Sequence, residues 1–326
     1  MTERPPWWGG DLQTIRNYLR QPTIALDPYP AEPLEFPMAD GSGDTLVATL
    51  NRPLAPESPR PLVILIHGLT GCEASTYMRA SARHLLGRGH PVLRLNLRGA
   101  GPSRPRCRLQ YHAGRSEDLR TVVGCMDGRL AANGIVIVGF SLGGNMLLKY
   151  LGEQGRRAPL LGAASVSAPI DLKATQLRLM QRRNRRYHDH LLARMKQEIA
   201  APDSMLTDLE RAALGTTSSV YEFDDRVVAP RNNFANADDY YARCSAKNLL
   251  GEIRVPTLLI HARNDPWIPA NAYLSFDWTS NPRLTSLLPK GGGHVGFHGF
   301  GSFVPWHDRC IAGFIDQLTV ARAGRR

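Results

Sequence analysis

The stretch Gly134-Ile135-Val136-Ile137-Val138-Gly139-Phe140-Ser141-Leu142-Gly143-Gly144 decides how this chain folds. Its first half is an uninterrupted apolar, β-branched run, which is typical of a central strand in a parallel sheet. Its second half has the pattern Gly-x-Ser-x-Gly, and residues 142–151 have the composition of a helix. A serine at so tight a strand-to-helix turn presents its hydroxyl above the sheet, and a Cβ at Gly139 or Gly143 would collide with neighbouring backbone. We therefore predict that Ser141 is a nucleophile.

The alternation of apolar runs and helical segments continues on both sides of this turn. It predicts an α/β fold with a mostly parallel central sheet flanked by helices. Expected strands cover residues 62–67, 91–96, 134–139, 161–166, 255–260 and 284–288. Expected helices cover residues 75–86, 116–130, 142–151 and 307–321, the second with Ser116 as its N-cap.

The chain divides into three parts by composition. The strand pattern stops after residue 168 and resumes only at residue 255, and the segment between is helical in character and rich in arginine. We interpret residues 169–250 as a helical cap, or lid, inserted over one end of the sheet. The core of the fold then comprises residues 38–168 and 251–326, and the proline-rich residues 1–37 form an N-terminal arm packed across it.

Two later loops offer partners for Ser141. A serine hydroxyl is a poor nucleophile without a base, and in folds with this turn the order along the chain is Ser, then Asp or Glu, then His. Asp265 follows the strand expected at residues 255–260, and His294 lies in a glycine-rich loop after the strand expected at residues 284–288. Both loops leave the sheet at the edge where Ser141 lies. We predict that His294 is the general base and that Asp265 orients it.

The negative charge of a tetrahedral intermediate needs two N–H donors. The residue after the nucleophile supplies one, which is Leu142. The loop His67-Gly68-Leu69-Thr70-Gly71, after an earlier strand, is expected to supply the other from Leu69. We expect His67 to be a structural hydrogen-bonding group beside this loop.

Other interpretations of the two later loops remain open. Asp265 could cap its own turn before Pro266, and His298 competes with His294 for the role of base. The two histidines could also suggest a metal site. The segment is too rich in glycine to form an aligning helix and shows no third ligand, so we expect neither a metal nor a cofactor.

The chain is basic, with 40 Lys and Arg against 29 Asp and Glu, a formal charge of +11. Much of the excess lies in residues 178–186. We interpret this stretch as the solvated face of an amphipathic helix, with contact to anionic lipid as the alternative. No recognition motif or interleaved aromatic set accompanies the charge, so we expect no specific nucleic-acid partner.

Cysteine usage and the start of the chain bear on location. The five cysteines are scattered and odd in number, which fits a reducing compartment better than a disulfide framework. The first residues show no signal-peptide pattern, and no apolar run approaches the roughly 18 residues that a membrane span needs. The sequence predicts a cytoplasmic protein, and peripheral contact with the inner membrane stays open.

Several motifs together are more specific than Gly-x-Ser-x-Gly. They are Gly10-Asp11-Leu12-Gln13-Thr14-Ile15, His67-Gly68-Leu69-Thr70-Gly71, Asn96-Leu97-Arg98-Gly99, Tyr111-His112-Ala113-Gly114 with Glu117-Asp118, Gly139-Phe140-Ser141-Leu142-Gly143-Gly144-Asn145, Asn264-Asp265-Pro266 and Gly292-Gly293-His294-Val295-Gly296-Phe297. With them the chain resembles, over nearly its whole length, the YheT-like family of α/β-hydrolases, which includes mammalian α/β-hydrolase-domain lipases and yeast medium-chain acyltransferase/esterases. The resemblance implies an α/β-hydrolase fold and the same triad, Ser141, Asp265 and His294. It also implies hydrolysis of carboxylic esters, either short- or medium-chain acyl esters or acylglycerols. Position 11 is Asp where many relatives have His.

These observations predict a serine carboxylesterase that acts on a small-molecule acyl ester through an acyl-enzyme. Thioester hydrolysis or acyl transfer would use the same triad. A catalytically silent binding protein on the same fold is the alternative outside the enzymes. Arg98, Tyr111 and His112 are expected to form a structural network beneath the active-site loops, because buried polar groups usually serve as hydrogen-bonded scaffolding, with contact to the substrate as the alternative.

Overall fold

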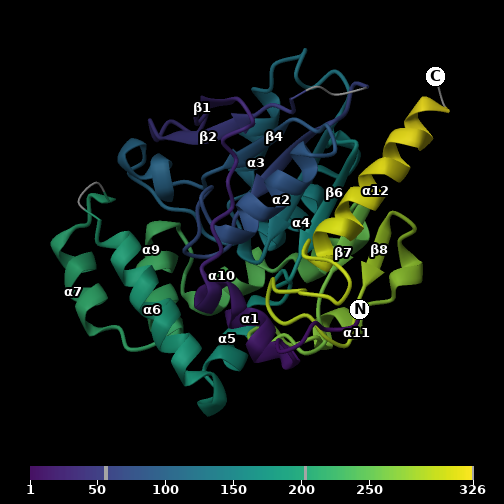
Figure 1. The fold of residues 1–326 in the computed structure, drawn as a ribbon. Coiled ribbons are helices and arrows are strands. Elements are labelled where there is room, and N and C mark those ends of the chain that lie inside the picture. The colour runs from purple at the N-terminus through teal and green to yellow at the C-terminus, as the bar shows by residue number, and fades with distance from the viewer. Residues whose placement is uncertain (55–57, 202–203, 325–326) are drawn as a thin grey trace.

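The computed structural model describes residues 1–54, 58–201 and 204–324, and this part of the chain contains one eight-stranded sheet (Figure 1). The strand order is β1-β2-β4-β3-β5-β6-β7-β8. The β1–β2 and β2–β4 pairs are antiparallel, and the remaining pairs are parallel. The strands are β1 (Ala31–Pro37), β2 (Thr45–Asn51), β3 (Leu62–Ile66), β4 (Val92–Leu95), β5 (Ile135–Phe140), β6 (Gly162–Val166), β7 (Thr257–Ile260) and β8 (Leu284–Leu287).

Helices cover both faces of the sheet, which explains why its central strands are apolar throughout. Every residue of β3 and of β5 is buried. Val63 and Leu65 pack with helices α2 and α12, whereas Leu62, Ile64 and Ile66 pack on the other face with α3 and α4. These helices are α2 (Thr76–Leu86), α3 (Ser116–Gly124), α4 (Leu142–Gln154) and α12 (Trp306–Ala323).

The strands and helices expected from the sequence are present, but the prediction for residues 116–130 is wrong in two respects. The helix ends at Gly124, because Asp127 accepts hydrogen bonds from the N–H groups of Arg129 and Leu130 and closes a turn there. Ser116 is the first helical residue rather than the N-cap, and its hydroxyl donates to Glu153. The antiparallel strands β1 and β2 were not predicted.

Residues 169–250 form helices beyond the carboxyl end of the sheet, and no strand occurs among those that the structure describes. The helices here are α5 (Leu172–Leu179), α6 (Arg185–Ile199), α7 (Asp208–Thr216), α8 (Val220–Phe223), α9 (Ala229–Arg231) and α10 (Ala237–Cys244), with a π-helical turn η5 (Asp224–Val228). They enclose a small apolar core of their own around Leu192, Phe223 and Val227. We keep the name cap for this segment; the division into arm, core and cap stays a prediction.

The first residues of the chain are more ordered than the word arm suggests. They contain helix α1 (Gly9–Arg20), which lies beside the cap helices in Figure 1, before the chain continues into β1. The other helices that the structure describes are α11 (Asn271–Leu274) and the short 3-10 helices η1 (Gly101–Arg106), η2 (Gly155–Arg157), η3 (Arg182–Asn184), η6 (Ala246–Glu252) and η7 (Trp278–Ser280). Of the helices described, none combines the length and the hydropathy required to cross a bilayer.

Candidate active site

Ser141 lies at the sharp turn between β5 and α4. Its backbone has φ 50° and ψ −121°, a conformation that residues other than glycine rarely adopt. The glycines on either side permit the turn: an ideal Cβ at Gly139 would lie 2.5 Å from the carbonyl oxygen of Gly143, and one at Gly143 would lie 2.4 Å from that of His67. The turn leaves the Ser141 side chain partly exposed at the carboxyl edge of the sheet.

His294 and Asp265 meet Ser141 at this edge. The Nε2 atom of His294 is 3.0 Å from Ser141 Oγ, and its Nδ1 atom is 2.8 Å from Asp265 Oδ2. An Nδ1–H that donates to the carboxylate leaves Nε2 free to accept the Ser141 proton. The three side chains predicted from separate loops therefore form one continuous hydrogen-bonded chain.

Asp265 is held rigidly and stays ionised. Its Oδ1 accepts the N–H groups of Trp267 at 2.8 Å and Ile268 at 3.0 Å, so the carboxylate both caps its turn and faces His294. Burial favours the neutral acid, but the neighbouring His294 and these donors outweigh burial and lower the pKa of Asp265. The Trp267 ring stacks on the His294 ring with centroids 4.4 Å apart, which fixes the ring plane.

The loop after β3 lies against the serine. An ideal Cβ on Gly68 would fall 2.8 Å from Ser141 Cβ, so only glycine fits here. The neighbouring N–H groups of Gly68 and Thr70 donate to the hydroxyls of Tyr77 and Tyr111. By contrast, the N–H groups of Leu69 and Leu142 have no hydrogen-bond acceptor among the described residues.

His67 has the structural position expected of it. Its Nδ1 atom is 2.8 Å from the carbonyl oxygen of Gly68, and its Nε2 accepts the N–H of Leu97 at 3.0 Å. Complete burial lowers the pKa of His67 to about 4, so the ring is neutral. The ring thereby ties the loop after β3 to the loop after β4.

The N-terminal arm supplies contacts that sequence reasoning missed. Thr14 Oγ1 accepts the backbone N–H of His294 at 2.8 Å, and the fully buried Gln13 accepts the N–H of His298 at 2.7 Å. Glu3 accepts hydrogen bonds from the side chain of Asn264 and the N–H of Gly292, so one carboxylate joins the loops that hold Asp265 and His294. The only signal for this in the sequence was the Gly10 to Ile15 motif, whose role was not apparent.

The structure bears on two alternatives for these loops, His298 as the base and a metal site. His298 is buried against the arm, and its Nε2 has no hydrogen-bond partner in the described structure, whereas His294 reaches Ser141. Burial lowers the pKa of His298 to about 3. The described residues include no group of three or more His, Cys, Asp or Glu side chains arranged to hold a metal ion.

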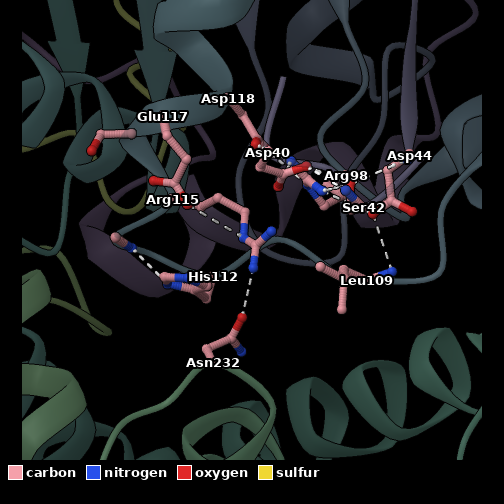
Figure 2. A network of polar contacts seen from close by, with 12 residues as sticks. Asp40, Ser42, Asp44, Arg98, Leu109, His112, Arg115, Glu117, Asp118 and Asn232 are labelled. Carbon is pink, nitrogen blue, oxygen red and sulfur yellow. Dashed lines mark hydrogen bonds and ion pairs between the residues drawn. The ribbon is translucent and has the colours of Figure 1, made fainter. Parts of the chain in front are cut away.

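Arg98 anchors a buried polar network beneath the site, as the sequence suggested (Figure 2). Its guanidinium donates to Asp44 at 2.9 Å and to Asp118 at 3.1 Å, and Asp40 is 2.9 Å away. The Arg98 carbonyl accepts the N–H of Tyr111, whose hydroxyl in turn holds the loop after β3. The network therefore reaches the backbone beside Ser141.

A cavity of about 850 Å³ extends from Ser141 and His294 under the cap, and most of its lining is apolar. Ligand pockets for molecules of drug size fall in this range. Two carboxyl groups line it: Glu198 accepts the Tyr111 hydroxyl, and Asp224 accepts the Tyr241 hydroxyl at 2.6 Å. Burial raises the pKa of each carboxyl to about 7, so neither presents a full charge to the cavity at neutral pH.

The sequence matches the family described as "alpha/beta hydrolase fold" over residues 61–299. The chain belongs to the α/β-hydrolase family. YheT of Escherichia coli (strain K12) is 32% identical over 292 residues, which cover 88% of this chain and 84% of YheT, and the expected resemblance to YheT-like proteins is thereby confirmed.

Two further proteins show the range of the similarity. The monoacylglycerol lipase of Saccharomyces cerevisiae is 29% identical over 279 residues, which cover 81% of this chain but only 62% of the lipase. Among solved structures, the Pyrococcus furiosus esterase Pf2001 superposes with a TM-score of 0.58 at 18% identity, covering 89% of this chain and 93% of that one. The second comparison supports the fold alone.

Proposed function

We propose that this protein hydrolyses carboxylic esters through an acyl-enzyme on Ser141, with His294 as general base, Asp265 as the acid that orients it, and the N–H groups of Leu69 and Leu142 as the oxyanion hole. The observation that carries the proposal is the 3.0 Å contact between His294 Nε2 and Ser141 Oγ at the floor of an apolar cavity. A binding protein would need the cavity but not a base within reach of a strained serine.

The chemistry follows from the geometry. Ser141 Oγ attacks the ester carbonyl as its proton passes to His294 Nε2, and Asp265 stabilises the resulting imidazolium. The oxyanion forms beside Leu69 and Leu142, whose N–H groups have no other acceptor among the described residues and so need not exchange partners during the reaction. His294 returns the proton to the departing alcohol, and water then repeats the cycle to release the acid.

The cavity favours an acyl group of medium length. Its lining includes Leu172, Leu179, Leu191, Ile199 and Phe223, and burying each methylene of an acyl chain on such a surface contributes about 0.8 kcal/mol. The carboxyl groups of Glu198 and Asp224, which are only partly ionised at neutral pH, could hydrogen-bond to a substrate with hydroxyl groups, such as an acylglycerol. The name of the yeast relative, a monoacylglycerol lipase, supports the same class.

The test is a series of p-nitrophenyl esters from acetate to decanoate, assayed with the unmodified protein and with Ser141→Ala and His294→Ala. We expect kcat/KM to rise with chain length to an optimum at medium length. The two variants should lose at least about three orders of magnitude. Turnover that survives in both variants, or none in the unmodified protein, would contradict the proposal.

A further inference from the structure

The cavity reaches the surface between the arm and the cap. Among the residues that line it, Tyr18 and Leu19 of α1 are 69% and 57% exposed, and Arg183, Arg186 and His190 on the cap side are exposed as well. Residues that both line the cavity and face outward mark its mouth. Helix α1 therefore forms one side of the mouth, and the beginning of α6 with the preceding turn forms the other.

The two sides are in direct contact. Asp11 accepts hydrogen bonds from Arg183 at 3.1 Å and from the Tyr187 hydroxyl at 3.0 Å. Seven residues along α1, the ring of Tyr18 lies edge-on to His190 with centroids 6.0 Å apart. The helices thus run side by side, and their outer surfaces form one continuous rim around the mouth.

This rim is unusually apolar for an exposed surface. Trp8, the N-cap of α1, is 60% exposed, and the α1 side chains of Leu12, Ile15 and Leu19 follow it at the spacing of one helical face, with Ile15 partly buried. On the cap side, Met180 directly follows α5, three residues before Arg183, and is 46% exposed. We call these side chains, with Tyr18, the apolar rim.

Arginines surround the apolar rim. Arg20 is the last residue of α1, and Arg182, Arg183, Arg185 and Arg186 lie where the cap turns from α5 into α6, all of them exposed. Arg183 pairs with Asp11 and Arg185 with Asp189. Arg20, Arg182 and Arg186 have no acidic partner in the part of the chain that the structure describes, so the rim carries an uncompensated positive charge.

We propose that the apolar rim and its arginines are a landing surface for an anionic lipid bilayer, which places the mouth of the cavity against the membrane. Exposed Trp, Tyr and Leu side chains on a helix bordered by arginine are suited to the boundary between headgroups and acyl chains. Each arginine near an anionic surface contributes about fivefold in partitioning. A second copy of the chain, by contrast, would have to bury these like charges against one another.

Binding of the full-length Ser141→Ala protein to vesicles tests the surface independently of the proposed catalysis. The vesicles are phosphatidylglycerol mixed with phosphatidylcholine, compared with phosphatidylcholine alone, in co-sedimentation at low and high salt. The decisive variant adds Arg182→Gln and Arg186→Gln. The matched control adds Arg156→Gln and Arg157→Gln, two exposed arginines just past the end of α4 that is far from Ser141. This helix begins directly after Ser141 and, at 13 residues, is about 20 Å long.

We expect binding to the anionic vesicles that weakens with salt, a loss of about 25-fold in the decisive variant, and parental binding in the control. Trp8 should shift its emission to the blue on binding, and Trp8→Phe should remove that shift. Failure of the Ser141→Ala protein to bind anionic vesicles would overturn the proposal, as would equal losses in the two arginine variants. Self-association that the decisive variant abolishes, without vesicle binding, would assign the rim to a second copy instead.

Discussion

Replacing Thr14 with valine tests whether the N-terminal arm positions His294, the proposed base. Thr14 Oγ1 donates to the carbonyl of Gly10 at 2.6 Å and accepts the backbone N–H of His294 at 2.8 Å. Valine has the same shape but can make neither bond. Thr14→Val therefore leaves the N–H of His294 without its acceptor while it keeps the packing of the helix.

The size of the effect follows from the strain in the His294 loop. Gly293, Val295 and Phe297 all have positive φ, so the loop depends on its contacts to hold this path. An unsatisfied, partly buried N–H costs about 1–3 kcal/mol. If the loop shifts to satisfy this N–H, His294 moves away from Ser141. A cost of about 1–3 kcal/mol in holding His294 in place then corresponds to a loss of about 5- to 150-fold in the rate of the chemical step.

The assay is the kcat and KM of a medium-chain p-nitrophenyl ester. We expect the loss in kcat, with KM changed less, because the hydrogen bond positions the base rather than the substrate. Thr14→Ser keeps the hydroxyl and should retain most of the activity. Activity of Thr14→Val within twofold of the unmodified protein would refute this reasoning, and so would an equal loss in Thr14→Ser.

Three further changes probe other parts of the structure. Gly68→Ala should lower kcat/KM more than tenfold, because its Cβ would lie 2.8 Å from Ser141 Cβ, whereas Gly215→Ala, with no atom within 4 Å, should leave activity unchanged; equal effects would contradict this. Arg98→Met should lower the free energy of unfolding in urea by about 3–5 kcal/mol, since it strands the buried carboxylates of Asp44 and Asp118, and a loss below 1 kcal/mol would count against the network. Burial raises the pKa of Asp224 to about 7, so its contribution to stability is full below about pH 4 and lost as the pH rises through 7. Asp224→Asn should therefore remove up to about 4 kcal/mol from the dependence of the free energy of unfolding on pH. An unchanged slope of that free energy against pH would refute the assignment.

The sheet and the convergence of the three site residues could be predicted because strong local patterns encode them. The apolar runs at β3 and β5 are buried on both faces, so they have no alternation that could be misjudged. Asp265 and His294 follow parallel strands whose carboxyl ends must meet at one edge. Loop position along the chain was therefore enough to place both near Ser141.

What the sequence did not reveal depends on contacts between distant segments. Thr14 and Gln13 lie 280 and more residues before the backbone groups they bind, and nothing local marks them as supports of the His294 loop. The helix expected to reach residue 130 ends at Gly124 because Asp127 competes for backbone N–H groups, a local choice that helical periodicity does not register. The edge strand β1 contains two prolines, which argue against a strand in the sequence, although the burial of its residues alternates along the strand.

The most direct test of the account is where a fluorophosphonate probe reacts. Such a probe phosphonylates a serine hydroxyl that a neighbouring base activates, and peptide mapping by mass spectrometry locates the adduct. The account predicts one adduct, on Ser141, formed by the unmodified protein and lost in both Ser141→Ala and His294→Ala. An unmodified protein that takes up no label, or a label on another residue that persists in Ser141→Ala, would contradict the claim that Ser141 is an activated nucleophile.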